Sequence, residues 1–110
     1  MGKSKVFNIV EIIEYIPHSV VIKTIIKKIT GNVSAVSFDS GEALSEKKSP
    51  FDTFIQVIDG NAEIVINDIS SLIDAGQSML IPAHSCNTIE ANVRLKMLST
   101  IIKNGYDEVS

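Results

Sequence analysis

The chain has 110 residues, which is the usual size of one domain and too short for two. Hydrophobic residues make up 45% of the chain, charged residues make up 21%, and the net charge is -3, so the composition is typical of a soluble globular protein and gives no sign of nucleic-acid binding. The single cysteine excludes an intrachain disulfide, and with only two histidines it excludes a zinc cluster of cysteines and histidines, so we expect a cytoplasmic protein.

The N-terminal segment opens with lysines, as a signal peptide does. Glu11 and Glu14 interrupt the apolar core that a signal peptide needs, so we keep this segment in the fold. No apolar run approaches the ~18 residues of a membrane span, and we expect no membrane partner. Mixed helical spacing over residues 7–16 predicts a short helix or an irregular lead-in, which Pro17 ends.

The rest of the chain is rich in β-branched residues and predicts strands. Segments 20–29 and 33–38 flank a turn at 30–32 and predict a first hairpin. Segments 51–58 and 62–67 flank Asp-Gly-Asn at 59–61 and predict a second one. Further short strands are expected at 70–73, 78–82, 87–91 and 94–102. Short strands at this spacing predict one all-β domain over residues 1–110, built as a barrel or a sandwich.

Alternation in the last predicted strand decides which side chains face the interior. With Lys96 on the outside, Leu95, Met97, Ser99 and Ile101 share the inner face.

Two segments carry a family pattern: "GEALSEKKSPFDTFIQVIDG" at 41–60 and "GQSMLIPAHSCNTIEA" at 76–91. Together they resemble the two motifs of a small single-domain cupin. The glycine-to-glycine spacing of the first motif is intact from Gly41 to Gly60, and Gly76 and Pro82 have the separation of the second. The resemblance covers nearly the whole chain and implies a cupin-type jelly-roll β-barrel. The second glycine of the second motif is replaced by His84 here.

The metal-ligand positions of the family are changed. Laid on the motif spacing, three histidines and one glutamate of the family become Lys47, Ser49, Asn87 and Thr53. Hydroxyl and amide oxygens bind transition metals poorly, and a protonated lysine repels them. We therefore expect no metal and no cofactor, the one exception being an opportunistic site built on His84 with Cys86.

Individual residues near the motifs have more than one interpretation. In one interpretation, the charge of Lys47 replaces the missing cation and binds a carboxylate or phosphate. In the other, which is favoured, Lys47 lies in a polar loop, "SEKKS", and its side chain reaches solvent. His84 reaches the barrel mouth or is a locally hydrogen-bonded surface residue, which is again favoured. Asn87 both donates and accepts, so it is the best candidate for fixing a polar ligand. Asp52 is predicted to point away from the barrel centre, and Cys86 to be a small packed residue.

These observations favour a binding protein. A barrel cavity lined by Thr53, Ile55, Val57, Asn87, Met97 and Ser99 would accept a small, mostly apolar molecule with one polar group. The residues expected to bind the ligand are Lys47, Ser49, Thr53, His84, Asn87 and Met97, and no catalytic residue is assigned.

Two alternatives stay open. One is an enzyme that works through an unusual metal site, or through Lys47, His84 and Asn87 without metal. It has less support, because no nucleophile, base and orienting group can be named together. The other is a barrel filled by its own side chains that acts as a dimeric scaffold. In each case we expect a homodimer, because small cupins commonly pair through N-terminal strands and the Ile-rich segment 20–29 is costly as a bare sheet edge.

Overall fold

A computed structural model describes residues 6–46 and 49–103 of the chain. Regular structure in these residues consists of one 3₁₀ helix, Ile9–Glu11, and nine strands. The strands are β1 (Val20–Lys28), β2 (Gly31–Phe38), β3 (Ala43–Glu46), β4 (Asp52–Asp59), β5 (Asn61–Ile66), β6 (Ile69–Asp74), β7 (Ser78–Ile81), β8 (Asn87–Glu90) and β9 (Leu95–Ile102). Within the described residues, no helix has the length and apolar character needed to cross a membrane.

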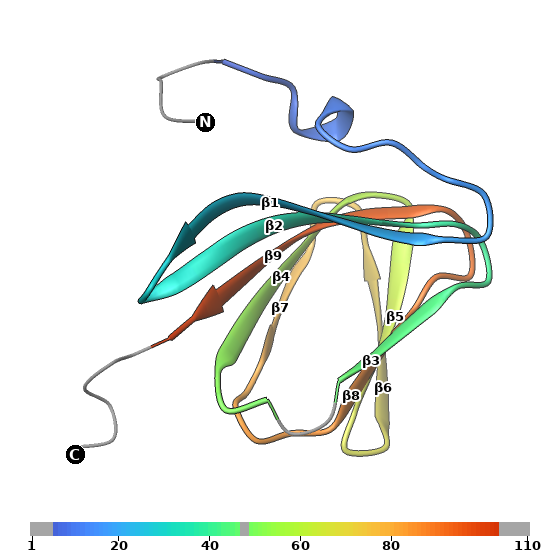
Figure 1. Cartoon of the computed structure of the whole chain (residues 1–110). Coiled ribbons are helices and arrows are strands. Elements are labelled where there is room, and N and C mark those ends of the chain that lie inside the picture. The colour runs from blue at the N-terminus through green and yellow to red at the C-terminus, as the bar shows by residue number, and fades with distance from the viewer. Residues whose placement is uncertain (1–5, 47–48, 104–110) are drawn as a thin grey trace.

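The strands form two antiparallel sheets that face each other (Figure 1). The five-stranded sheet has the order β1-β2-β9-β4-β7 and the four-stranded sheet has the order β3-β8-β5-β6. Because β9 lies between β2 and β4, and β8 between β3 and β5, strands distant in the sequence are neighbours in space. This interleaving of two sheets is the arrangement of a jelly roll, so the predicted all-β fold is confirmed.

The two predicted hairpins have different outcomes. β1 and β2 pair as expected, from Val20 with Phe38 to Lys28 with Gly31. The second prediction is wrong, because β4 belongs to the five-stranded sheet and β5 to the four-stranded one, and the two do not pair. At the turn between them Gly60 has a φ of +78°, and a Cβ there would collide with the carbonyl oxygen of Arg94. The glycine therefore marks a tight crossing from one sheet to the other.

Two further elements were not expected from the sequence. β5 and β6 form a hairpin whose two-residue loop, Asn67 and Asp68, has φ values of 49° and 70°. Asn and Asp tolerate this left-handed conformation, which a two-residue hairpin loop of this kind requires. β3 runs into the first two residues of the segment 45–49, for which the sequence favours a polar loop, and it pairs with β8, with Leu44 opposite Ile89.

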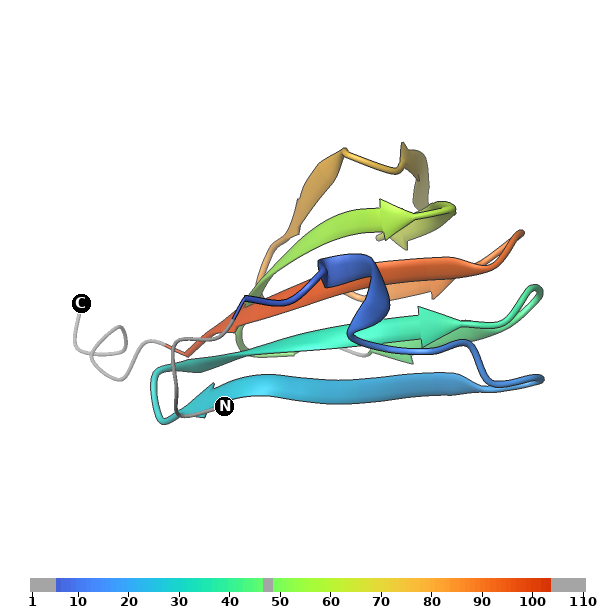
Figure 2. The same cartoon turned by 90° about the horizontal axis from the view of Figure 1, so that it is seen from above.

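The N-terminal segment crosses the outer face of the five-stranded sheet (Figure 2). It contains only a three-residue 3₁₀ helix, but Ile13 is 4% exposed and anchors the segment. The Ser37 hydroxyl donates to the carbonyl of Glu14 at 2.8 Å, and the Lys96 ammonium donates to that of Val10 at 2.5 Å. Lys96 therefore lies on the outer face, as predicted, yet is buried beneath this segment.

The hydrophobic core lies between the sheets, towards the end where β2 finishes and β9 begins. Phe38 and Leu95, which pair across these strands, are completely buried. Met97 and Val57 are each 1% exposed, so the predicted inward face of β9 is confirmed for its first half. Buried side chains fill the space between the sheets at this end of the jelly roll, so a binding cavity has room only towards the opposite end.

Candidate functional site

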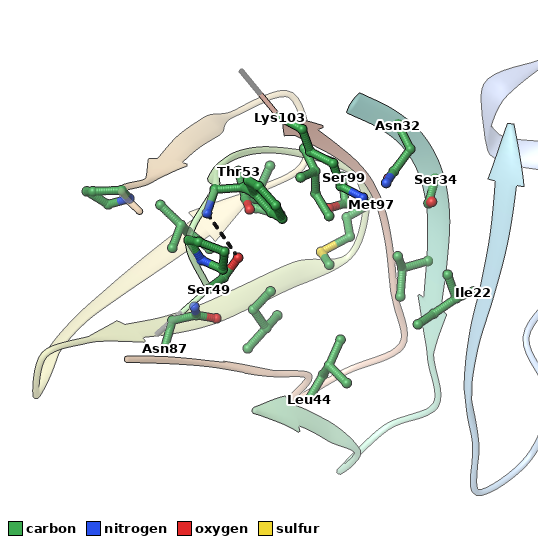
Figure 3. Close-up of a pocket in the computed structure, with 18 residues that line it drawn as sticks. Ile22, Asn32, Ser34, Leu44, Ser49, Thr53, Asn87, Met97, Ser99 and Lys103 are labelled. Carbon is green, nitrogen blue, oxygen red and sulfur yellow. Dashed lines mark hydrogen bonds between the residues drawn. The ribbon is translucent and has the colours of Figure 1, made fainter. Parts of the chain in front are cut away.

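A cavity of about 460 Å³ lies between the two sheets, and most of the 18 residues that line it are apolar (Figure 3). All five strands of the five-stranded sheet, β1, β2, β4, β7 and β9, contribute residues, and the four-stranded sheet contributes residues of β3 and β8. Residues 49–51, which precede β4, complete part of the wall. This volume falls in the range of about 300–1,000 Å³ that is usual for small-molecule sites.

The five-stranded wall changes from apolar to polar along β9. Met97, which is 1% exposed, lies opposite the buried Val36 of β2. Two residues further along β9, Ser99 pairs with Ser34, and two residues beyond that Ile101 pairs with Asn32. Since alternate residues of a strand face the same side, this series forms one continuous wall that becomes more polar and more exposed towards the end of β9.

The four-stranded wall shows the same change along β8. Ile89 and its partner Leu44 are apolar. Asn87, two residues earlier on the same face, is the first residue of β8 and is polar. The Asn87 side chain is only 9% exposed. Among the described residues no group makes a hydrogen bond to its amide, although Asn offers both a donor and an acceptor. Since no fully buried side-chain nitrogen or oxygen of the described residues lacks a partner, the Asn87 amide is open to the cavity, where it can bind water or a ligand.

Three of the four family ligand positions meet in this cavity. Ser49, Thr53 and Asn87 all line it (Figure 3). The Ser49 hydroxyl accepts a hydrogen bond from the Phe51 backbone N–H at 3.3 Å. Two hydroxyls and one amide do not fit the imidazole and carboxylate set that holds a transition metal. In residues 6–46 and 49–103, no three His, Cys, Asp or Glu side chains lie close enough together to hold a metal ion.

The remaining predicted site residues are distributed differently. Met97 lines the cavity with the three residues above, whereas Lys47 lies outside the described residues. His84 is exposed, has a φ of 66°, and is not part of the lining. Asp52 points away from the barrel centre, as predicted, and its carboxylate accepts a hydrogen bond from the Ala83 N–H at 2.8 Å.

Sequence reasoning missed three polar lining residues, Asn32, Ser34 and Lys103. A signal for each was present. Asn32 and Ser34 precede the inward-facing Val36 by four and two residues, so they share its face of the strand. Lys103 follows Ile101 by two residues and continues the inward series of β9. Of the six lining residues expected from the sequence, Val57 alone is not in the lining, because it lies in the closed core.

The prediction that Cys86 is a packed residue is wrong, because Cys86 is exposed. Its neighbour Asn87 faces inward, so the alternation of the chain turns the Cys86 side chain outward. The thiol therefore does not line the cavity.

Groups with a shifted pKa lie outside the cavity. Hydrogen bonds from the His18 and Ser40 backbone N–H groups, with Arg94, lower the pKa of Asp39. Burial, followed by the 2.6 Å hydrogen bond to Asp59, raises the pKa of Tyr15. Each of these shifts has a structural partner that explains it. Their origin is in the anchoring of the outer segments, and they give no indication of acid-base chemistry in the cavity.

Comparisons with known proteins identify the fold. No family model matches the sequence, and no curated protein matches it. Among solved structures, a conserved protein of unknown function from Streptococcus pyogenes has a TM-score of 0.88 at 21% identity, over 94% of this chain and 91% of that one. A cupin superfamily protein from Desulfitobacterium hafniense has a TM-score of 0.87 at 24% identity, over 93% of this chain and 94% of that one.

A larger protein also matches. The Cupin 2 conserved barrel domain protein from Leptotrichia buccalis has a TM-score of 0.84 at 28% identity, over 88% of this chain but only 47% of that one. This chain therefore spans about half the length of that protein.

Proposed function

We propose that this chain, which has the cupin jelly-roll fold, binds a small molecule in the cavity between its sheets and does so without a metal ion. The observation that carries the proposal is the lining itself: eleven of its eighteen residues are apolar and seven are polar, and the Asn87 amide makes no hydrogen bond among the described residues. Small-molecule sites typically combine an apolar wall with a few such polar groups, which fix the orientation of the ligand.

Binding is favoured over catalysis by the chemistry of the lining. The cavity-lining residues that the structure describes include no histidine, cysteine or carboxylate. A general base is usually a histidine or a carboxylate, and the serine and threonine hydroxyls of the lining need such a base within hydrogen-bonding reach to act as nucleophiles. Hydroxyls and an amide suffice to orient a ligand, whereas proton abstraction near neutral pH needs a stronger base.

A thermal-shift screen of organic acids, amides and divalent metals tests this proposal. A ligand that binds only the folded state raises the melting temperature, by an amount that grows with the logarithm of its concentration relative to its dissociation constant. We expect organic ligands to raise it and zinc, nickel or manganese not to do so.

Two matched variants locate the site. Ser99→Phe fills the cavity from the middle of β9, and Thr100→Phe adds the same side chain to the next residue, on the opposite face. We expect Ser99→Phe to remove the organic response and Thr100→Phe to preserve it. A response that survives Ser99→Phe, or that requires metal, would contradict the proposal.

We also propose that two copies of the chain pair through β1. This strand is at the edge of its sheet and pairs with β2 alone. Ile22 and Ile26 are 57% and 49% exposed, which is costly for an unpaired edge in water. We expect light scattering to give a dimer at micromolar concentration, and Ile26→Lys to shift the protein towards a monomer, whereas Leu72→Lys on the four-stranded sheet has no effect. A wild-type monomer would disprove this pairing.

A further inference from the structure

One end of the cavity carries a positive charge that the family motifs do not include. Lys103 follows β9, and it is the one charged residue in the lining that the structure describes. Its backbone N–H donates to the Thr30 carbonyl at 2.7 Å, which fixes the chain at this position. Its ammonium lies 5.3 Å from the centre of the Phe51 ring. A cation over an aromatic face is held in place by the ring without losing its charge.

This ammonium has unused capacity. In the described part of the chain no carboxylate forms an ion pair with Lys103, and no side-chain hydrogen bond uses its Nζ. A lysine ammonium has three donors, and when it is partly removed from water it binds an anion as a point charge. The lysine side chain is half-buried, so water screens such a contact only in part.

The charge lies at the polar end of a gradient. Asn32 and Thr53 pair with Ile101, and Lys103 follows two residues beyond it. Met97 and Val36 lie two steps deeper on the same wall. Figure 3 shows Lys103, Asn32 and Thr53 together towards one end of the cavity and Leu44 towards the other. The cavity is therefore polar and positive at its open end and apolar at its closed end.

We infer that the cavity binds an amphipathic monocarboxylate, with the carboxylate at Lys103 and the apolar body directed towards Met97. This inference rests on the proposed function and adds the chemical class of the ligand. One cation with neighbouring amide and hydroxyl donors matches one carboxylate in charge and in hydrogen bonding. The apolar depth excludes water from the body of the ligand and rewards a hydrocarbon chain.

Calorimetric titration with three eight-carbon probes tests the inference: octanoate, the neutral octanamide and the cationic octylamine. They share the apolar chain and differ in the charge of the head group. We expect octanoate to bind about fivefold more tightly than octanamide, since a partly exposed ion pair contributes on the order of 1 kcal/mol, and octylamine to bind more weakly than both. The preference for octanoate should shrink as salt is added.

Lys103→Met should abolish the preference for octanoate, because it should weaken octanoate binding more than octanamide binding. Lys28→Met serves as the matched control, because it removes the same charge from an exposed position on β1 that is not in the lining, and it should keep the preference. Lys103→Gln provides a second substitution if the methionine variant does not fold. A carboxylate preference that persists in Lys103→Met or Lys103→Gln overturns the inference.

The cavity-filling variant separates this failure from failure of the proposed function. If Ser99→Phe abolishes binding of both octanoate and octanamide while Lys103→Met keeps the preference, the cavity binds ligands but Lys103 is not the anion site. If none of the three probes binds, or if Ser99→Phe leaves binding intact, the cavity is not the site, and the proposed function and this inference both fall.

Discussion

Replacing Asn87 by leucine should make the protein more stable. The Asn87 side chain is 9% exposed, and among the described residues no protein group makes a hydrogen bond to its amide. In the described residues no fully buried side-chain nitrogen or oxygen lacks a partner, so this amide keeps some contact with water in the cavity. A fully buried unpaired amide would cost roughly 1–3 kcal/mol, and a leucine of similar volume removes the smaller cost that this partly hydrated amide carries. Because the amide borders a cavity, we take the lower end of this range, about 1 kcal/mol, which corresponds to a rise of about 4 °C in melting temperature for a domain of this size.

The gain in stability should be accompanied by a loss of binding. Leucine removes a donor and an acceptor from the lining, so we expect octanoate affinity to fall by about fivefold, the equivalent of one hydrogen bond. Urea denaturation measures the free energy of unfolding, and calorimetric titration measures the affinity. Asn87→Asp is the contrasting variant: it keeps the shape but buries a charge, so it should destabilise the fold.

A loss of stability in Asn87→Leu would refute this reasoning. It would mean that the amide already has a protein partner whose removal costs a hydrogen bond. Asn87 would then be a structural residue and not a group available to a ligand.

Three other outcomes follow from the structure. Ser49→His, Thr53→Glu and Asn87→His together should create a metal site, so nickel or zinc should raise the melting temperature of this variant and not that of the wild type; no response would show that the three positions do not converge as the lining places them. The pKa of Asp39 lies below its ordinary value of 3.8, so the contribution of this carboxylate to stability is present above pH 3.8 and is lost as the pH falls through the lowered pKa. Asp39→Asn should therefore flatten the pH dependence of the free energy of unfolding below about pH 4. The same pH dependence in the variant and the wild type would contradict this. Tyr15→Phe removes a 2.6 Å hydrogen bond and should cost about 0.5–1.5 kcal/mol, with faster hydrogen exchange confined to the N-terminal segment; unaltered exchange there would remove its anchoring role.

The sequence predicts the strands better than their pairing. Alternation along β9 placed Leu95 and Met97 inside, because the period of two is a local property of a strand. Pairing is not local. Gly60 looked like a hairpin residue, but the constraint that selects glycine there is the approach of the Arg94 carbonyl from a distant part of the chain.

The sequence predicted part of the candidate site, because motif spacing is a local property that the sequence shows directly. Ser49, Thr53 and Asn87 followed from motif spacing, and the structure places them in one cavity. Lys103 was missed because it lies beyond the last predicted strand, although it continues the alternation of β9. Cys86 was predicted to be packed because cysteine is usually buried. It is exposed, because it precedes the inward-facing Asn87 and its side chain therefore points to the opposite side.

The central claim is that a small molecule enters this cavity without a metal, and the methyl resonance of Met97 tests it most directly. Met97 is 1% exposed and lines the cavity, whereas Met79 on β7 is outside the lining and serves as an internal control. In methyl-labelled protein treated with a chelator, titration with octanoate should shift the Met97 signal saturably and by more than the signal of Met79, which pairs with Ile55 of the lining but is not itself part of it. A Met97 signal that does not respond, or that responds only after metal is restored, would contradict the claim.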